Sequence, residues 1–176
     1  MIIVNKLTFI IGGARSGKTA FALKLASASS GKKVYLATAE ALDDEMRLRI
    51  QRHKEERGGD WLTHEEPQGV ELAISSLAGQ DAKVILIDCL TLWLSNRILH
   101  ADSVILDEAA SLIRTITASG CEVIAISNEV GWGIVPENIL ARRFRDLAGD
   151  VNQMFANAAS SVYFVAAGIP LKLKGV

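Results

Sequence analysis

A glycine-rich segment between an apolar run and a helical pattern constrains this chain more than any other feature. Gly12 is followed by four residues and then by Gly17, Lys18 and Thr19, which is the spacing of a phosphate-binding loop. Glycines let backbone N–H groups close around a polyphosphate, and the positive end of the following helix strengthens the field. The alternative is a chance glycine turn, but the apolar run at Leu7–Ile11 and the helical pattern after the loop both fit the motif. The sequence therefore predicts a nucleotide-binding protein.

The side chains of this loop have separate expected roles. Lys18 is suited to neutralise β- and γ-phosphate oxygens, and the hydroxyl of Thr19 is suited to hold Mg²⁺. The candidate nucleotide-binding residues of the loop are Gly12, Gly13, Ala14, Arg15, Ser16, Gly17, Lys18 and Thr19.

A second phosphate-site signal is an acidic residue at the end of an apolar run. The run Val84–Ile87 leads directly into Asp88. Proteins with a phosphate-binding loop often place an aspartate at the end of a buried strand, where it reaches Mg²⁺ or its water shell. The alternative is that Asp88 caps a helix that starts at Leu90.

Composition sets the broad class of the protein. At 176 residues with a net charge of −1, the chain suggests a single domain, 1–176, and offers no electrostatic case for binding nucleic acid. The N-terminus is expected to be the first strand and not a signal peptide, and no apolar run approaches the roughly 20 residues needed to span a bilayer. Cys89 and Cys121 each lie beside an apolar run, so we expect buried reduced thiols. We expect a soluble, cytoplasmic protein.

Continuous apolar runs alternate with helical patterns along the chain, which favours an α/β fold with a mostly parallel sheet flanked by helices. A last segment around Pro170 could form an edge strand, because proline is tolerated at an edge and not in a sheet centre. The expected strands are Leu7–Ile11, Val34–Ala37, Val84–Ile87, Val123–Ile126 and Val162–Ala166, and the expected helices are Ala20–Ala28, Asp43–Arg57, Gly69–Leu77, Ile105–Ala118 and Ile139–Ala158.

The expected helix at Asp43–Arg57 carries a histidine between two arginines. Arg49, His53 and Arg57 share one helix face, and the guanidinium groups would keep His53 neutral and nucleophilic. The alternative is a solvated, charge-rich helix with an idle histidine. The other histidines, His64 and His100, have no comparable setting, and we expect them to be structural or exposed.

A glycine-containing loop follows the expected strand that ends near Ser127. The loop at 128–138 lies at the carboxyl end of a strand, where open α/β sheets bind ligands. Gly131 and Gly133 around Trp132 would permit a mobile loop; alternatively, Trp132 merely covers the core. The arginines that follow, Arg142, Arg143 and Arg145, could contact phosphate or form a solvated helix face.

These motifs together resemble the bifunctional adenosylcobinamide kinase / adenosylcobinamide-phosphate guanylyltransferase family of cobalamin assembly. The resemblance spans almost the whole chain, and the Asn-Glu-Val-Gly loop and the Arg-Ile-Gln-x-His segment are its most specific parts. It implies a single-domain P-loop NTPase with a RecA-like fold. The residues that carry it are 12–19, 35–39, 43–46, 49–54, 128–131, 133–138, 145, 146, 149 and 151–153.

The resemblance implies two half-activities with Mg²⁺ as cofactor. One transfers a γ-phosphoryl group from ATP or GTP to adenosylcobinamide, with Lys18 as a catalytic residue and Thr19 and Asp88 at the metal. In the other, His53 takes GMP from GTP as a phosphoramidate and passes it to adenosylcobinamide phosphate. Some relatives carry two adjacent histidines where this chain has Arg52 and His53.

The resemblance further implies a homotrimer that binds the corrinoid between subunits, and it adds nucleotide contacts outside the loop. These contacts are Thr38, Ala39, Glu40, Lys54, Glu55, Glu56, Arg57, Glu65 and Asp88. Two other functions stay open from the residues alone: a simple P-loop kinase of a small metabolite with an idle His53, and a non-catalytic nucleotide-sensing module. Lys18, Thr19 and Asp88 together argue against the sensor.

Overall fold

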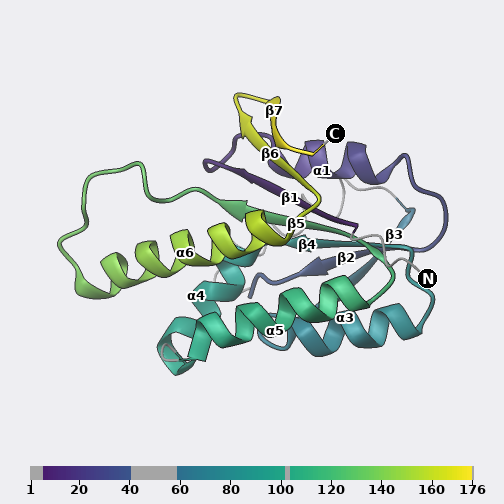
Figure 1. Ribbon diagram of the computed structural model, residues 1–176, viewed down its shortest axis with the longest axis horizontal. Helices are drawn as coiled ribbons and strands as arrows, with labels where there is room; N and C mark the ends of the chain where they lie inside the picture. Colours follow the sequence, from purple (N-terminus) through teal and green to yellow (C-terminus); the bar gives the residue numbers. More distant parts are fainter. Residues whose placement is uncertain (1–5, 41–58, 102–103, 176) are drawn as a thin grey trace.

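A seven-stranded sheet forms the centre of the molecule (Figure 1). The computed structural model describes residues 6–40, 59–101 and 104–175. The strand order is β3-β2-β4-β5-β1-β6-β7, and every neighbouring pair is parallel except β6 and β7. The strands are β1 (Leu7–Gly12), β2 (Lys33–Ala37), β3 (Trp61–Glu65), β4 (Val84–Asp88), β5 (Glu122–Asn128), β6 (Ser161–Ala166) and β7 (Ile169–Lys174).

Helices cover both faces of this sheet. Figure 1 shows α1 on one side of the sheet and α3, α5 and α6 on the other, and the buried clusters agree with this division. None of the described helices is both long and apolar enough to cross a membrane. The helices are α1 (Lys18–Ala26), α3 (Val70–Gly79), α4 (Leu90–Ala101), α5 (Ile105–Ala118) and α6 (Ile139–Ala158).

The apolar patterns of the sequence explain these two layers. The residues Val84–Ile87 of β4 are fully buried, as expected for a central strand covered on both faces. On α5, the buried positions Ile105, Ala109, Leu112 and Ile116 recur every three or four residues, so one stripe of the helix faces the sheet. The predicted α/β fold with a mostly parallel sheet is confirmed.

The strands at the two edges of the sheet, β3 and β7, differ in how well the sequence predicted them. The strand β7 was expected as an edge strand, and Pro170 indeed lies there, paired with Val165 of β6. The strand β3 was not predicted, because Thr63, His64 and Glu65 interrupt any apolar run. It exists because the exposed backbone edge of β2 offers it a parallel ladder. The helix expected at Asp43–Arg57 lies outside the described residues.

The hairpin between β6 and β7 contacts the glycine-rich loop. Ala167 and Gly168 form its turn with φ values of 50° and 79°. The backbone N–H of Gly168 donates a hydrogen bond to the carbonyl oxygen of Ser16 at 2.8 Å. The C-terminal hairpin therefore supports the loop that follows β1.

Packing between β1 and β6 leaves no space for a side chain at Gly12. A Cβ built on Gly12 would lie 2.2 Å from the backbone carbonyl oxygen of Val165, whereas one built on Gly13 meets no atom within 4 Å. We predict that Gly12→Ala lowers the free energy of unfolding by roughly 2 kcal/mol or more, because backbone cannot yield as a side chain can. The matched control is Gly13→Ala, where the added Cβ meets no atom within 4 Å. Urea unfolding of the two variants measures the loss of stability, and equal unfolding midpoints would contradict the prediction.

Candidate nucleotide-binding site

The carboxyl ends of the central strands bring the candidate residues to one edge of the sheet. In the strand registers, Gly12 of β1 lies opposite Asn128 of β5, and Asp88 of β4 lies opposite Ala37 of β2. Ligands of open α/β sheets bind at this edge. Because β4, β5 and β1 are adjacent in the sheet, the phosphate-loop motif, the acidic residue and the loop at 128–138 are neighbours.

The N-terminus of α1 is built to receive an anion. Gly17 precedes the helix with φ 94°, and a Cβ there would lie 3.0 Å from the Cα of Gly168. Among the described residues, no side chain caps the helix, and the first turn of the helix holds no acidic residue. The first backbone N–H groups of a helix need partners, and phosphate oxygens satisfy them.

Lys18 lies folded into this loop. Its Nζ donates a hydrogen bond to the carbonyl oxygen of Gly13 at 2.6 Å and lies 3.4 Å from the Oγ of Ser16. The residue is only 6% exposed. The ammonium group is thus held where the loop would enclose phosphate, as its predicted role in neutralising phosphate charge requires.

Asp88 faces the loop and not the helix that follows it. Its Oδ2 accepts hydrogen bonds from the hydroxyl of Thr19 at 3.0 Å and from the hydroxyl of Tyr35 at 2.5 Å. A carboxylate beside a threonine hydroxyl is a hard-oxygen donor set that suits Mg²⁺, which keeps few protein ligands besides waters and phosphates. The described side chains thus fit the expected cofactor, and the roles of Thr19 and Asp88 at the metal stay predictions.

The peptide that follows Asp88 is braced by Thr38. The Oγ1 of Thr38 donates to the carbonyl oxygen of Cys89 at 2.8 Å and accepts from the N–H of Cys89 at 2.7 Å. Asn96 of α4 donates in turn to the carbonyl oxygen of Thr38 at 2.8 Å. The hydroxyl of Thr38, expected at the nucleotide, is completely buried and holds the end of β4.

The remaining nucleotide-binding candidates divide between the described edge and the chain beyond it. Ala39 and Glu40 follow β2 and are half-buried, and Glu65 is the last, exposed residue of β3. The other candidates, His53 and residues 54–57, lie outside the described residues.

Both cysteines are buried and free, as the sequence predicted. Burial, together with the nearby charge of Asp88, raises the pKa of the Cys89 thiol to about 12. This thiol stays protonated at neutral pH, so it is a packing group beside the site and not a nucleophile.

A network of side chains holds the start of the 128–138 loop. The Oγ1 of Thr91 accepts a hydrogen bond from the N–H of Asn128 at 2.7 Å, and Asn152 of α6 donates to the carbonyl oxygen of Asn128 at 3.3 Å. The N–H of Glu129 donates to the carbonyl oxygen of Gly12 at 3.0 Å. The loop therefore begins at a fixed point against the phosphate loop. The Oδ1 of Asn152 is buried without a hydrogen-bond partner among the described residues.

Farther along, this loop projects away from the sheet before α6 begins (Figure 1). Trp132 is 80% exposed, so the alternative in which it covers the core is wrong. Its ring stacks on Phe164 of β6 with centroids 5.2 Å apart. Arg142 donates to the carbonyl oxygens of Pro136 and Glu137 at 2.8 and 2.7 Å, so this arginine fastens the end of the loop.

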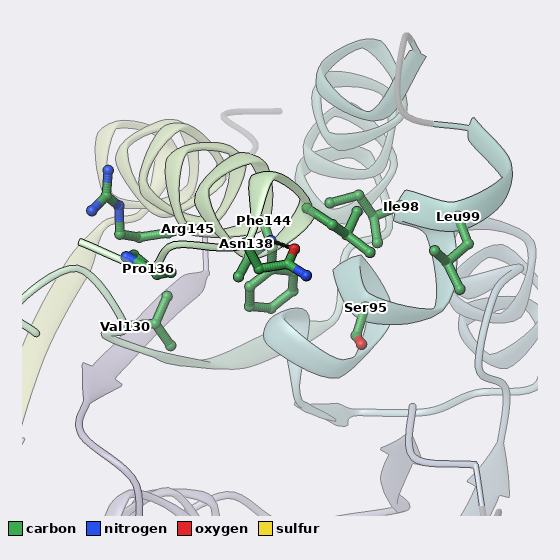
Figure 2. Close-up of a pocket in the computed structure, with 10 residues that line it drawn as sticks. Ser95, Ile98, Leu99, Val130, Pro136, Asn138, Phe144 and Arg145 are labelled. Atoms are coloured by element: carbon green, nitrogen blue, oxygen red, sulfur yellow. Dashed lines mark hydrogen bonds between the residues drawn. The ribbon is translucent and has the colours of Figure 1, made fainter. Parts of the chain in front are cut away.

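A groove of about 530 Å³ opens between this loop and two helices. Figure 2 shows side chains from α4, from the loop and from the start of α6 around it. The phosphate loop is not part of its lining. The lining residues are Ser95, Ile98, Leu99, Val130, Pro136, Asn138, Leu140, Ala141, Phe144 and Arg145.

Several residues of this site escaped the sequence analysis as contributors. Tyr35 and Asn152 lie in motifs that carried the family resemblance, but no role was predicted for them, and Thr91 was not singled out. All three act through contacts between elements far apart in the sequence. Gly168 could have been found, because a glycine between two short strands supplies the positive φ that a tight hairpin turn needs.

The glycine loop, its buried lysine and the facing aspartate on a mostly parallel sheet define a P-loop nucleotide-binding protein. Two solved structures support the expected RecA-like fold. A KaiC-like protein from Pyrococcus horikoshii has a TM-score of 0.52 at 16% identity, covering 91% of this chain and 70% of its own. The RadB recombinase has a TM-score of 0.55 at 15% identity, covering 91% and 74%.

Sequence comparison assigns the family within this class. The family described as cobinamide kinase / cobinamide phosphate guanyltransferase matches residues 8–173, and the chain belongs to it. The bifunctional adenosylcobalamin biosynthesis protein CobP of Pseudomonas aeruginosa is 42% identical over 94% of this chain and 96% of its own. The protein CobU of Salmonella typhimurium, of the same description, is 39% identical over 96% and 99%. The resemblance seen in the motifs is confirmed.

The hydrogen bond from the Asn128 N–H to Thr91 leads to a stability prediction. Thr91→Val keeps the shape of the side chain but removes the acceptor of the Asn128 N–H, so we expect a loss of about 1–3 kcal/mol in the free energy of unfolding. The matched control is Thr117→Val on α5, where the hydroxyl bonds only to helix carbonyls. We expect the control to change stability by less than about 0.5 kcal/mol. Equal urea midpoints for the two variants would show that the hydrogen bond between Asn128 and Thr91 does not contribute to stability.

Proposed function

We propose that this chain phosphorylates adenosylcobinamide and then transfers GMP from GTP to the product, which yields adenosylcobinamide-GDP. The single observation that carries the proposal is the phosphate loop with Lys18 inside it and Thr19 facing Asp88. Membership of the cobinamide kinase / cobinamide phosphate guanyltransferase family supplies the substrate class.

In the kinase half-reaction, the described residues stabilise charge. The hydroxyl of adenosylcobinamide attacks the γ-phosphorus of ATP or GTP, and the nucleoside diphosphate leaves. The N-terminal amides of α1 and the ammonium group of Lys18 stabilise the charge on the phosphoryl oxygens. Thr19 and Asp88 would hold Mg²⁺, which would supply further positive charge to the same oxygens.

In the transferase half-reaction, His53 is the nucleophile. Its ring nitrogen attacks the α-phosphorus of GTP, a P–N bond forms, and pyrophosphate leaves. The phosphate of adenosylcobinamide phosphate then attacks the same phosphorus and releases His53. The support for His53 is the sequence motif, since the residue lies outside the described part of the chain.

The proposal extends to the assembly and its location. A homotrimer in the cytoplasm, with adenosylcobinamide or its phosphate bound between subunits, is the form we propose. Its support is the family resemblance. The rival function is a simple P-loop kinase of a small metabolite, in which no GMP is ever attached to the protein.

Labelled GTP separates these two functions. We predict that protein incubated with Mg²⁺ and GTP, without corrinoid, takes up label from the α-phosphate and none from the γ-phosphate. The label should be labile to acid and stable to alkali, as a phosphoramidate is. Denaturing gels of the labelled protein provide the measurement.

Two histidine variants control this experiment. His53→Ala should abolish the labelling. His64→Ala, which changes a histidine on β3, should be labelled like the unchanged protein. If the unchanged protein binds Mg·GTP and takes up no α-label, the guanylyltransferase proposal is wrong and the simple kinase is the better account.

A lysine pair on α1 tests the kinase half-reaction. Lys18 is the first residue of α1 and is folded into the loop, whereas Lys24 is exposed in the last turn of the same helix. We predict that Lys18→Ala lowers γ-phosphoryl transfer to adenosylcobinamide by about 100-fold or more, because charge stabilisation in the transition state is lost. Lys24→Ala should retain the unchanged rate, and similar rates for both variants would remove Lys18 from the reaction.

A further inference from the structure

Tyr35 is a buried tyrosine whose hydroxyl reaches the phosphate site from a neighbouring strand. It lies on β2, is 4% exposed, and packs in the layer beneath α1. Its ring meets that of Trp61 edge-on, with centroids 6.4 Å apart and planes at 86°. The ring is therefore held on one side by β3 while its hydroxyl points along the sheet to the site.

The strand register explains how a tyrosine at this position reaches Asp88. Tyr35 lies opposite Leu86, and Ala37 lies opposite Asp88, so the two are offset by two residues along the strands. Two residues of a strand span roughly 6.6 Å, and side chains in strands lean along the strand direction. A phenol ring with its hydroxyl covers that offset, and a small residue at Ala37 leaves the path open.

Both hydroxyl contacts fall on the same oxygen of Asp88. Tyr35 donates to Oδ2 at 2.5 Å, and Thr19 donates to Oδ2 at 3.0 Å. An ionised carboxylate has about four lone-pair sites, so it can accept both hydroxyls and still face a cation. The two donors come from different elements, β2 and α1, and together they restrict rotation of the carboxylate.

We propose that Tyr35 is a positioning residue for the metal–nucleotide site: its hydroxyl orients the Asp88 carboxylate toward Thr19 and the Mg²⁺ of the bound nucleotide. The proposal rests on the proposed function, since it takes Asp88 to be the metal-facing group. In this role Tyr35 acts through its hydrogen bond to Asp88 and not through a contact of its own with nucleotide or metal. Partners of this kind orient the ligating groups and typically change metal affinity by about 10- to 100-fold.

The competing explanation is a structural hydroxyl. A buried tyrosine needs a hydrogen-bond partner, and the Oδ2 of Asp88 serves as an acceptor for its hydroxyl. In that case the loss of the hydroxyl would lower stability and leave metal affinity unchanged. The two explanations therefore differ in a binding measurement.

The test compares the two tyrosines of the chain. Tyr35→Phe removes the hydroxyl at Asp88, and Tyr163→Phe is the matched control on β6, where the ring packs against Phe21 at 5.0 Å. The probes are Mn²⁺, followed by its electron spin resonance, and a GTP analogue with a methylene group between the α- and β-phosphates, which blocks GMP transfer.

We expect Tyr35→Phe to weaken Mn²⁺ binding to the protein–analogue complex by about tenfold or more. Affinity for the analogue in excess EDTA should stay unchanged, and Tyr163→Phe should bind Mn²⁺ as the unchanged protein does. Adding Tyr35→Phe to Asp88→Asn should cause no further loss, because Tyr35 acts through Asp88. Unchanged Mn²⁺ affinity in Tyr35→Phe, or full additivity with Asp88→Asn, would overturn the proposal.

A second measurement needs no variant at Tyr35. With fluorotyrosine incorporated, the chain gives two fluorine resonances, and Tyr163→Phe assigns them. We expect Mg²⁺ added to the protein–analogue complex to shift the Tyr35 resonance and to leave that of Tyr163 in place. An unmoved Tyr35 resonance at saturating Mg²⁺ would overturn the proposal.

These results are distinguishable from failure of the proposed function. If the unchanged protein shows no metal-dependent binding of the analogue, both proposals fall. If it binds metal and analogue normally while Tyr35→Phe behaves in the same way, only the role of Tyr35 falls, and the labelling of His53 is unaffected.

Discussion

The Asp88 carboxylate ties together three elements that are remote in the sequence. It ends β4, accepts a hydrogen bond from Thr19 of α1, and accepts another from Tyr35 of β2. Hydrogen bonds to an ionised group are stronger than those between neutral groups. Removing one partner leaves the other buried polar group unsatisfied, which costs free energy. The orientation of α1 relative to the sheet and the orientation of the acidic group are therefore coupled at one point.

Close backbone packing supplies the second constraint around this point. Gly12 lies against the carbonyl oxygen of Val165, and Gly17 lies against Gly168. Side chains at either glycine would push β6 or the C-terminal hairpin away from the loop. The C-terminal hairpin thus supports the phosphate loop through the hydrogen bond from Gly168 to Ser16, next to the uncapped start of α1.

Predictability followed the range of the interactions. The loop at Gly12–Thr19 was recognised because its spacing and its flanking strand and helix patterns are local. The aspartate after a buried strand was recognised because it occurs together with that loop. The strand β3 was missed, because its polar residues are ordered by pairing with β2 and not by their own pattern. Trp132 was assigned a core-covering alternative that its exposure rules out, since a tryptophan in a loop does not reveal its own packing partner.

The sequence by itself determined the class of fold, the phosphate loop and the family, because apolar periodicity and motif spacing are local properties that survive without coordinates. Only the tertiary structure decided which residues support the site. The register of β2 against β4 brings the hydroxyl of Tyr35 to Asp88, and the packing of α4 and α6 brings Thr91 and Asn152 to Asn128. Such contacts depend on how strands align and helices dock, and that alignment is a property of the whole chain.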